Sequence, residues 1–198
     1  MILDIAAYIL QTQEHISHLK LQKLLYYLKV WSLVNGNPII PESFVKWKHG
    51  PVNKEVYEKF KMYGDKNIPA VQAGESAIEN KEFVDFVLEC YAQYDAITLS
   101  LMTHQDDPWK NTSDNAVISD ASLLKYYSSL PFAKNFPVDP LKPFYPVDTN
   151  MHYAFIFDMD KDAVEQTIAY PSFSIYKQHV AEAKSDVDKW LFEIAQSK

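Results

Sequence analysis

Apolar residues recur at intervals of three and four along most of the first 130 residues, which is the spacing of one face of an α-helix. The pattern predicts about six helices, over residues 2–10, 17–35, 53–63, 79–93, 96–103 and 120–130. Ser17, Asn53 and Ser119 stand where N-cap residues are expected, and Gly36 and Gly64 stand where helices end. The less regular residues 41–49 indicate a short extended piece. We therefore expect a mainly α protein with a single helical domain over residues 1–130.

A different pattern follows Leu130. Five of the chain's 11 prolines lie in residues 131–146, and they favour an extended connector over residues 131–150. In the C-terminal extension, residues 151–198, weak alternation predicts a strand over 152–159. Apolar steps of four and three then predict a terminal amphipathic helix with a heptad seam, which needs a partner surface that its own domain could supply. The seam residues are Tyr176, Val180, Ala183, Val187, Trp190 and Ile194.

Composition excludes several classes of protein. Hydrophobic residues make up 47% and charged residues 23% of the 198, as in a globular chain that folds alone. The formal net charge of −7 opposes binding to a phosphate backbone, so nucleic acid is not expected as a partner. Lys20 and Lys23 are interpreted as a solvated helix face. No apolar run is long enough to span a membrane and no signal-peptide pattern is present, so the cytoplasm is the expected compartment.

The sequence offers little support for reaction chemistry. Cys90, the only cysteine, lies in an apolar helical pattern and is interpreted as a packing residue. The four glycines, Gly36, Gly50, Gly64 and Gly74, are dispersed. Their spacing excludes the phosphate-binding loops and the nucleophile elbow of serine hydrolases, which need clustered glycines. We therefore expect no cofactor.

Two phrases contain the residues most typical of a functional site. They are residues 47–52, with Tyr57 shortly after, and residues 103–109. Each phrase places a Trp and a His near a Pro at a break between helices. Trp47 and Trp109 could each fill the core, with the indole N–H bonded to a carbonyl, or anchor a partner surface, and the sequence leaves both readings open.

The second phrase also brings carboxylates close to an imidazole. His104, Asp106 and Asp107, with His49 folded alongside, could bind a divalent metal and support hydrolysis. Alternatively the carboxylates accept backbone N–H bonds at the start of the next helix, with Pro108 at its first position. We favour this structural joint, because a metal site needs three or four ligands and the others would have to come from far along the chain.

The same two alternatives, a place in the core or at the surface, apply to Tyr26 and Tyr27. Adjacent residues on a helix point about 100° apart, so both side chains can hardly enter the same core. We expect one of the two to reach the surface.

Taken in order, these motifs resemble the Panacea, or SocA-like, antitoxin domain of bacteria and their phages. The matching positions are 21–27, 31–33, Trp47, 50–52, Tyr57, 60–64, Thr103-His104, Pro108-Trp109 and Tyr126-Tyr127. The resemblance covers residues 2–130. It implies a mainly helical domain that has no reaction of its own and neutralises a toxin by direct association. One relative resembles an adaptor that delivers its bound toxin for degradation.

The resemblance predicts a cytoplasmic antitoxin of a toxin–antitoxin or phage-defence system, with a cognate toxin as its partner. The alternatives left open are an adaptor that works with a protease or chaperone, and the metal-dependent hydrolase. The extension 151–198 has no counterpart in the family pattern and is predicted to determine toxin specificity, and no helix-turn-helix module precedes the domain, so operator binding is not expected. The predicted partner-binding or motif residues are Lys23, Tyr26, Tyr27, Trp47, His49, Gly50, Pro51, Val52, Tyr57, His104, Pro108, Trp109, Tyr176, Trp190 and Ile194.

Overall fold

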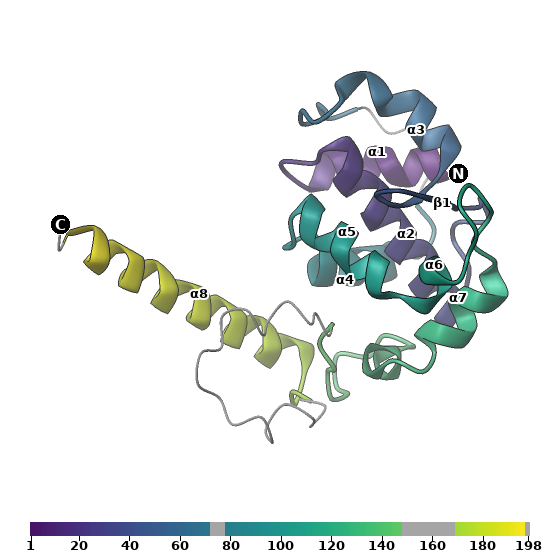
Figure 1. Cartoon of the computed structure of the whole chain (residues 1–198). Helices are drawn as coiled ribbons and strands as arrows, with labels where there is room; N and C mark the ends of the chain where they lie inside the picture. Colours follow the sequence, from purple (N-terminus) through teal and green to yellow (C-terminus); the bar gives the residue numbers. More distant parts are fainter. Residues whose placement is uncertain (72–77, 148–168, 197–198) are drawn as a thin grey trace.

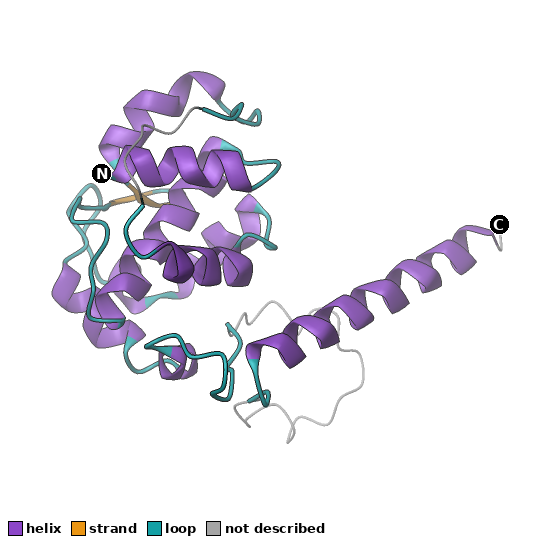
Figure 2. Ribbon diagram, turned by 180° about the vertical axis from the view of Figure 1, so that it is seen from behind, coloured by secondary structure: helices purple, strands orange, loops and turns teal. Residues whose placement is uncertain are grey.

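The computed structural model describes residues 1–71, 78–147 and 169–196, and most of its elements are helices (Figure 1). The elements in chain order are α1 (Ile2–Thr12), α2 (His18–Val34), β1 (Val45–Trp47), β2 (Gly50–Val52), α3 (Lys54–Phe60), the 3-10 turn η1 (Lys61–Tyr63), α4 (Lys81–Tyr91), α5 (Ala96–Gln105), α6 (Asp107–Lys110), α7 (Asp120–Tyr127), the 3-10 turn η2 (Pro131–Asn135) and α8 (Phe173–Gln196). The mainly α prediction is confirmed. The turn η2 was not predicted, whereas α6 begins at the joint where a helix with Pro108 in its first turn was expected. The expected extended piece is one half of an antiparallel hairpin (Figure 2).

Local signals explain several of the helix starts. The side chains of Ser17, Asn53 and Ser119 each accept a hydrogen bond from a backbone N–H in the first turn of the helix that follows. These bonds satisfy donors that a helix N-terminus otherwise leaves unpaired. Asp95 does the same for α5, where its carboxylate accepts from two backbone N–H groups.

Helix α2 occupies the centre of the domain. It contacts α1, α3, α4, α5, α7 and strand β2, so it is surrounded on all sides. Tyr26 and Tyr27 are therefore both buried, and the prediction that one of them reaches the surface is wrong. The solvated face predicted for Lys20 and Lys23 is also wrong at Lys23, which is fully buried, while Lys20 is partly buried. The expectation that a helix has one buried and one solvated face does not hold for a helix that other elements cover on every side.

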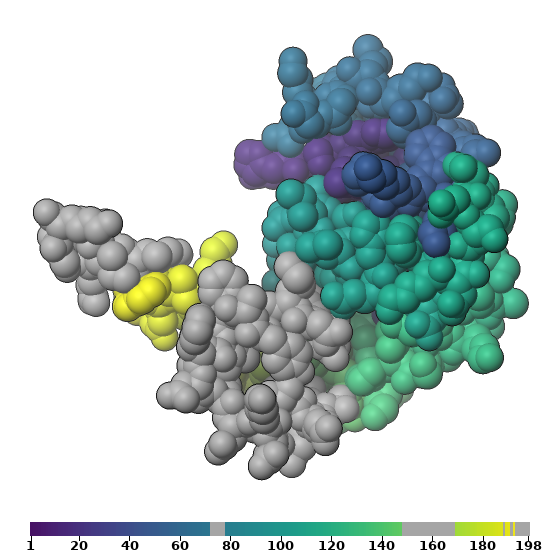
Figure 3. Space-filling view, viewed as in Figure 1, coloured from purple at the N-terminus to yellow at the C-terminus, as the bar shows by residue number. Residues whose placement is uncertain are grey.

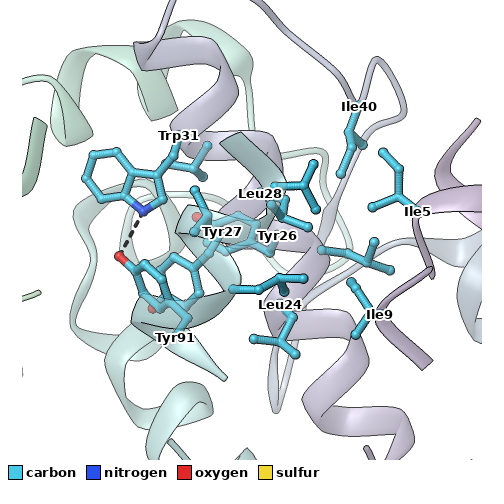
Figure 4. Close-up of a cluster of buried hydrophobic side chains, with 14 of the residues drawn as sticks. Ile5, Ile9, Leu24, Tyr26, Tyr27, Leu28, Trp31, Ile40 and Tyr91 are labelled. Carbon is cyan, nitrogen blue, oxygen red and sulfur yellow. Dashed lines mark hydrogen bonds between the residues drawn. The ribbon is translucent and has the colours of Figure 1, made fainter. Parts of the chain in front are cut away.

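Aromatic rings join α2 to α4, as Figure 4 shows, and also to α7. Tyr27 stacks on Tyr91 with ring centroids 4.2 Å apart. The indole N–H of Trp31 donates a hydrogen bond of 2.8 Å to the hydroxyl of Tyr91. Tyr127 packs edge-on against Trp31 at 5.3 Å. Because the Trp31 indole and the hydroxyls of Tyr91 and Tyr127 have hydrogen-bond partners, they can be buried with the rings at little cost from polar groups.

The proline-rich segment packs against this aromatic core. Phe132 and Phe144 are buried, and Phe136 stacks on Trp31 with centroids 5.5 Å apart. The backbones of Phe144 and Tyr170 exchange two hydrogen bonds of 2.8 Å, which fixes the start of the segment leading to α8. The segment expected to be an extended connector therefore contributes side chains to the core, although a division of the chain at Leu130 remains a prediction.

Helix α8 projects from the domain, and the contacts that anchor it to other described residues lie in its first turns (Figure 1). Phe173 contacts Phe86 with ring centroids 4.9 Å apart, and Tyr176 contacts Phe144 at 4.6 Å. Lys177 forms an ion pair with Glu89 of α4 at 3.0 Å. The predicted amphipathic helix is present, whereas the strand predicted over residues 152–159 lies outside the described residues. None of the helices described here has the length and apolarity required to cross a bilayer.

Candidate functional site

The two motif phrases meet where the β1–β2 hairpin packs on α2 and α5. Figure 3 shows the dark blue hairpin segment at the surface, next to the teal segment that includes α5. The hydroxyl of Ser100 donates to the carbonyl oxygen of His49 at 2.9 Å. The end of the hairpin is held by a reciprocal pair, because the Asn53 N–H donates to the Gln22 side chain at 2.8 Å and that side chain donates to the Asn53 carbonyl at 3.1 Å. We call this region the motif junction, formed by Lys23, residues 46–53, residues 100–104 and Trp109.

Gly50 is the closest-packed position of the motif junction. Its φ of +101° lies in the region that favours glycine. A Cβ atom added there would lie 2.6 Å from Lys23 Nζ and 2.7 Å from Thr103 Oγ1. The requirement for glycine in the Gly50-Pro51-Val52 motif is thus both conformational and steric.

Lys23 lies beneath this glycine and is shielded from water. Its ammonium donates a hydrogen bond of 2.9 Å to the carbonyl oxygen of Pro51. Burial disfavours the charged form and lowers the pKa of Lys23 from 10.5 to about 7. The residue therefore links α2 to strand β2 and is inaccessible to a partner protein.

His104, Trp109 and Lys46 form a stack at the edge of the junction. The rings of His104 and Trp109 have centroids 4.2 Å apart, and Lys46 Nζ lies 4.4 Å from the Trp109 ring. Burial lowers the pKa of His104, and the nearby charges of Lys23 and His49 lower it further, while a hydrogen bond to the Lys48 carbonyl opposes them. His104 Nε2 and Trp109 Nε1 are buried without a hydrogen-bond partner among the described residues. The carbonyl acceptor considered for a core Trp is thus not found for Trp109 in that part of the chain.

On the hairpin and α3, the accessible motif side chains are Trp47, Tyr57 and His49, while His104 and Trp109 at the edge of the junction are also half-buried. Trp47 and Tyr57 are half-buried and pack edge-on with centroids 4.8 Å apart, and His49 is exposed. Pro51 and Val52 are buried in strand β2. On α5, Ile97 and Leu101 are exposed apolar residues one helical turn apart. We had not predicted this pair, and its four-residue spacing in a helix flanked by buried positions was the signal available in the sequence.

Asp106 does not cap α6 as expected. The Asp106 side chain makes no capping bond and instead accepts a hydrogen bond from the Tyr127 hydroxyl. Burial raises the pKa of Asp106 to about 6, although hydrogen bonds from Tyr127 and Tyr126 and the charge of Lys110 oppose the rise. The joint itself is real, because the chain turns at Asp106 and Pro108 is buried in the first turn of α6.

The metal-site alternative finds no donor set in the described part of the chain. No group there brings together three or more His, Cys, Asp or Glu side chains in a way that could hold a metal ion. Asp107 is exposed at the start of α6, whereas Asp106 is buried against tyrosines. Cys90 is buried, and burial raises the pKa of its thiol, as expected for a packing residue.

Comparison with protein families matches residues 21–110 to the family described as antitoxin SocA-like, Panacea domain. This segment matches the model of the SocA-like Panacea domain over 90 of the 198 residues. The matched range contains both motif phrases and the whole motif junction, and it is shorter than the predicted span of residues 2–130. Comparison with curated proteins and with solved structures found no match. The family is described as antitoxin-like, which supports a role other than catalysis.

The terminal helix lies beyond the Panacea match and exposes most of its heptad seam. Val180, Val187 and Trp190 are 37%, 53% and 60% exposed, while Tyr176 is half-buried at the anchored end. Ile194 belongs to α8, but its side chain lies outside what is described. The predicted partner residues thus separate into two groups. Lys23, Tyr26, Tyr27 and Gly50 support the Panacea domain from within, whereas the accessible motif side chains and the α8 seam are available to a partner.

Proposed function

We propose that this protein is an antitoxin that neutralises a cognate toxin by binding to it directly. The Panacea domain supports the antitoxin role. The observation that most favours direct binding is the apolar face of α8, where Val180, Val187 and Trp190 are all exposed. A helix that presents apolar residues at intervals of three and four can occupy a groove on another protein, and Trp is the residue most often found at the centre of such interfaces.

The length of α8 suits this mode of binding. The helix spans Phe173–Gln196, and its first turns are fixed by aromatic contacts and by the Lys177–Glu89 ion pair. A stable protein complex buries roughly 1,600 Å² in total, which a partner could reach by covering the free turns of α8 together with further accessible surface of the domain. The anchored base reduces the entropy lost on binding, because the orientation of the helix is set before the toxin arrives.

A test of the proposed function uses the neighbouring reading frame. The neighbouring gene is expressed alone and together with this protein, and colony survival is measured. Killing by the neighbour alone, survival on co-expression and co-elution of the two purified proteins as one complex are the expected results. If the neighbour kills but the proteins do not co-elute, neutralisation does not occur by direct binding.

The same experiment distinguishes the adaptor alternative. Toxin levels are compared in cells that contain or lack each of the major cytoplasmic proteases. An antitoxin that acts by occupying the toxin leaves the level of toxin unchanged in every strain. Survival that requires one protease, together with loss of toxin only when that protease is present, would assign the protein as an adaptor.

A further inference from the structure

A cavity of about 270 Å³ lies between the end of α5, helix α7 and the turn η2. Its walls are largely aromatic and apolar, and they include Trp31, Tyr91, Tyr126 and Phe132. Among the described residues that line it, Asp106 is the one carboxylate and Lys110 the one amine. The surface that the cavity exposes is polar and apolar in similar measure. A cavity that combines apolar walls with converging polar groups is a common form of binding site.

Burial of the Asp106 carboxylate carries a large desolvation cost. Asp106 is only 9% exposed, and no described residue forms an ion pair with it. Tyr127 donates a hydrogen bond to its carboxylate, and Tyr126 donates a second. An ionised carboxylate accepts about four hydrogen bonds, so these two leave capacity toward the cavity. An Asn would cost less to desolvate but offers one acceptor oxygen in place of two, so a carboxyl group here has acceptor capacity beyond what the two tyrosine bonds require.

We propose that this cavity binds a cationic group on an apolar stem, specifically the guanidinium of an arginine side chain on the toxin. The identity of the partner rests on the proposed antitoxin function, whereas the chemistry of the cavity does not. The carboxylate of Asp106 can accept two N–H bonds from the planar guanidinium, and the surrounding rings pack against its faces and stem. Arginine is also among the residues that contribute most to binding at protein interfaces. The net charge of −7 on the chain favours the approach of a basic partner.

The positive charge of Lys110 should affect the binding of a cation in the opposite direction to the carboxylate of Asp106. The exposed side chain of Lys110 lines the same cavity, and its charge acts on Asp106. A second cation near the carboxylate weakens the binding of an incoming one. Removing the Lys110 charge should therefore strengthen binding of a guanidinium, while removing the Asp106 charge should abolish it.

The test is an NMR titration of the full chain with two blocked amino acids. Their backbone ends carry no charge, and they differ only in the group at the end of the side chain. N-acetyl-arginine methylamide carries the guanidinium, and N-acetyl-citrulline methylamide replaces it with a neutral urea of nearly the same shape. The methyl resonances of Met102 and Val147, which line the cavity, report binding. The arginine probe should give saturable shifts, and the citrulline probe should bind at least tenfold more weakly. Equal shifts with both probes, or shifts that do not saturate, would overturn the proposal.

Two variants complete the test. Asp106→Asn should reduce binding of the arginine probe at least tenfold, and Lys110→Met should increase it severalfold. Unchanged binding in a folded Asp106→Asn protein would overturn the proposal. If Asp106→Asn does not fold, Lys110→Met decides, because binding that is unchanged or weaker in that variant contradicts the arrangement.

Failure of this inference can be separated from failure of the antitoxin function. The probe titration needs no toxin, so binding of the arginine probe stands even if the neighbouring gene is not toxic. Conversely, a toxin that binds wild type and Asp106→Asn with equal affinity, with no binding of the probe, would refute the arginine pocket and leave the antitoxin function intact.

Discussion

The side-chain amino group of Lys23 donates a buried hydrogen bond of 2.9 Å to the carbonyl oxygen of Pro51, which ties the central helix to the hairpin. Both residues belong to the Panacea match, and the bond lies directly beneath Gly50. A lysine here has two consequences that can be measured. It makes stability depend on pH in an unusual range, and it makes the glycine above it irreplaceable.

The first prediction concerns the pH dependence of stability. Burial lowers the pKa of Lys23 to about 7 in the folded protein, against 10.5 for an unperturbed lysine. Between these values the unfolded chain binds the proton and the folded protein does not. The Lys23 contribution to stability is therefore full above pH 10.5 and is lost as the pH falls to 7. Across pH 7 to 9, the free energy of unfolding should rise by at most about 1.4 kcal/mol per pH unit from this group.

Urea denaturation of wild type and Lys23→Met at pH 7, 8 and 9 measures this dependence. The difference in slope between the two proteins should equal the Lys23 contribution. Lys125→Met removes an exposed positive charge from α7 and controls for the change in net charge. Parallel slopes for wild type and Lys23→Met would show that Lys23 stays protonated in the folded protein.

The second prediction concerns Gly50. Gly50→Ala places a Cβ atom 2.6 Å from Lys23 Nζ on a backbone with φ of +101°, so it should destabilise the protein by several kcal/mol, at least ~3. Gly36→Ala is the matched control, because Gly36 also has a positive φ, +75°, but nothing lies within 4 Å of an added Cβ. The control should cost only about 1 kcal/mol. Equal losses in urea denaturation would mean that backbone conformation, and not the close approach of Lys23, explains the glycine.

The third prediction tests whether residues 131–147 are part of the folded domain. Phe132 is buried and its ring lies 4.7 Å from that of Trp31, so Phe132→Ala should lower the free energy of unfolding by about 3–5 kcal/mol. Leu141→Ala, in the same segment but 90% exposed, should change it by less than about 0.5 kcal/mol. A small effect at Phe132 would favour the interpretation of residues 131–150 as an extended connector outside the folded domain.

These examples show which features of the molecule were accessible from sequence. The helix starts were predictable, because Ser17, Asn53 and Ser119 act on the backbone three residues away and need no tertiary information. The amphipathic pattern of α8 was predictable for the same reason. Both depend only on neighbours along the chain.

The environment of α2 was not predictable in the same way. Whether a helix has one wet face depends on how many other elements surround it, and six elements surround α2. Lys23 therefore lies in the core although a lysine is normally solvated, and Asp106 pairs with Tyr127, 21 residues away, in place of the adjacent helix end. Long-range partners of this kind determined the interior of the site, whereas the motif order was sufficient to indicate the family.

The last prediction concerns the part of the protein that we expect to contact the toxin. Trp190→Ala, alone or with Ile194→Ala, should weaken toxin binding at least tenfold and reduce survival on co-expression. Trp190 is 60% exposed, so its removal leaves no cavity and the melting temperature should stay within a degree or two of wild type. The dissociation constant, measured by calorimetry, and the melting temperature together separate a lost contact from a lost fold.

Phe192→Ala provides a control on the same helix. Phe192 is 64% exposed and lies two residues from Trp190, about 200° around the helix axis, so it belongs to the opposite face. If the toxin binds the seam, Phe192→Ala should leave affinity close to wild type. Equal losses at Trp190 and Phe192 would mean that the toxin surrounds the helix and does not recognise one face. If neither change affects binding, the toxin does not contact this face of α8. The accessible side chains of the motif junction, among them Trp47, His49 and Tyr57, are then the next candidates for its interface.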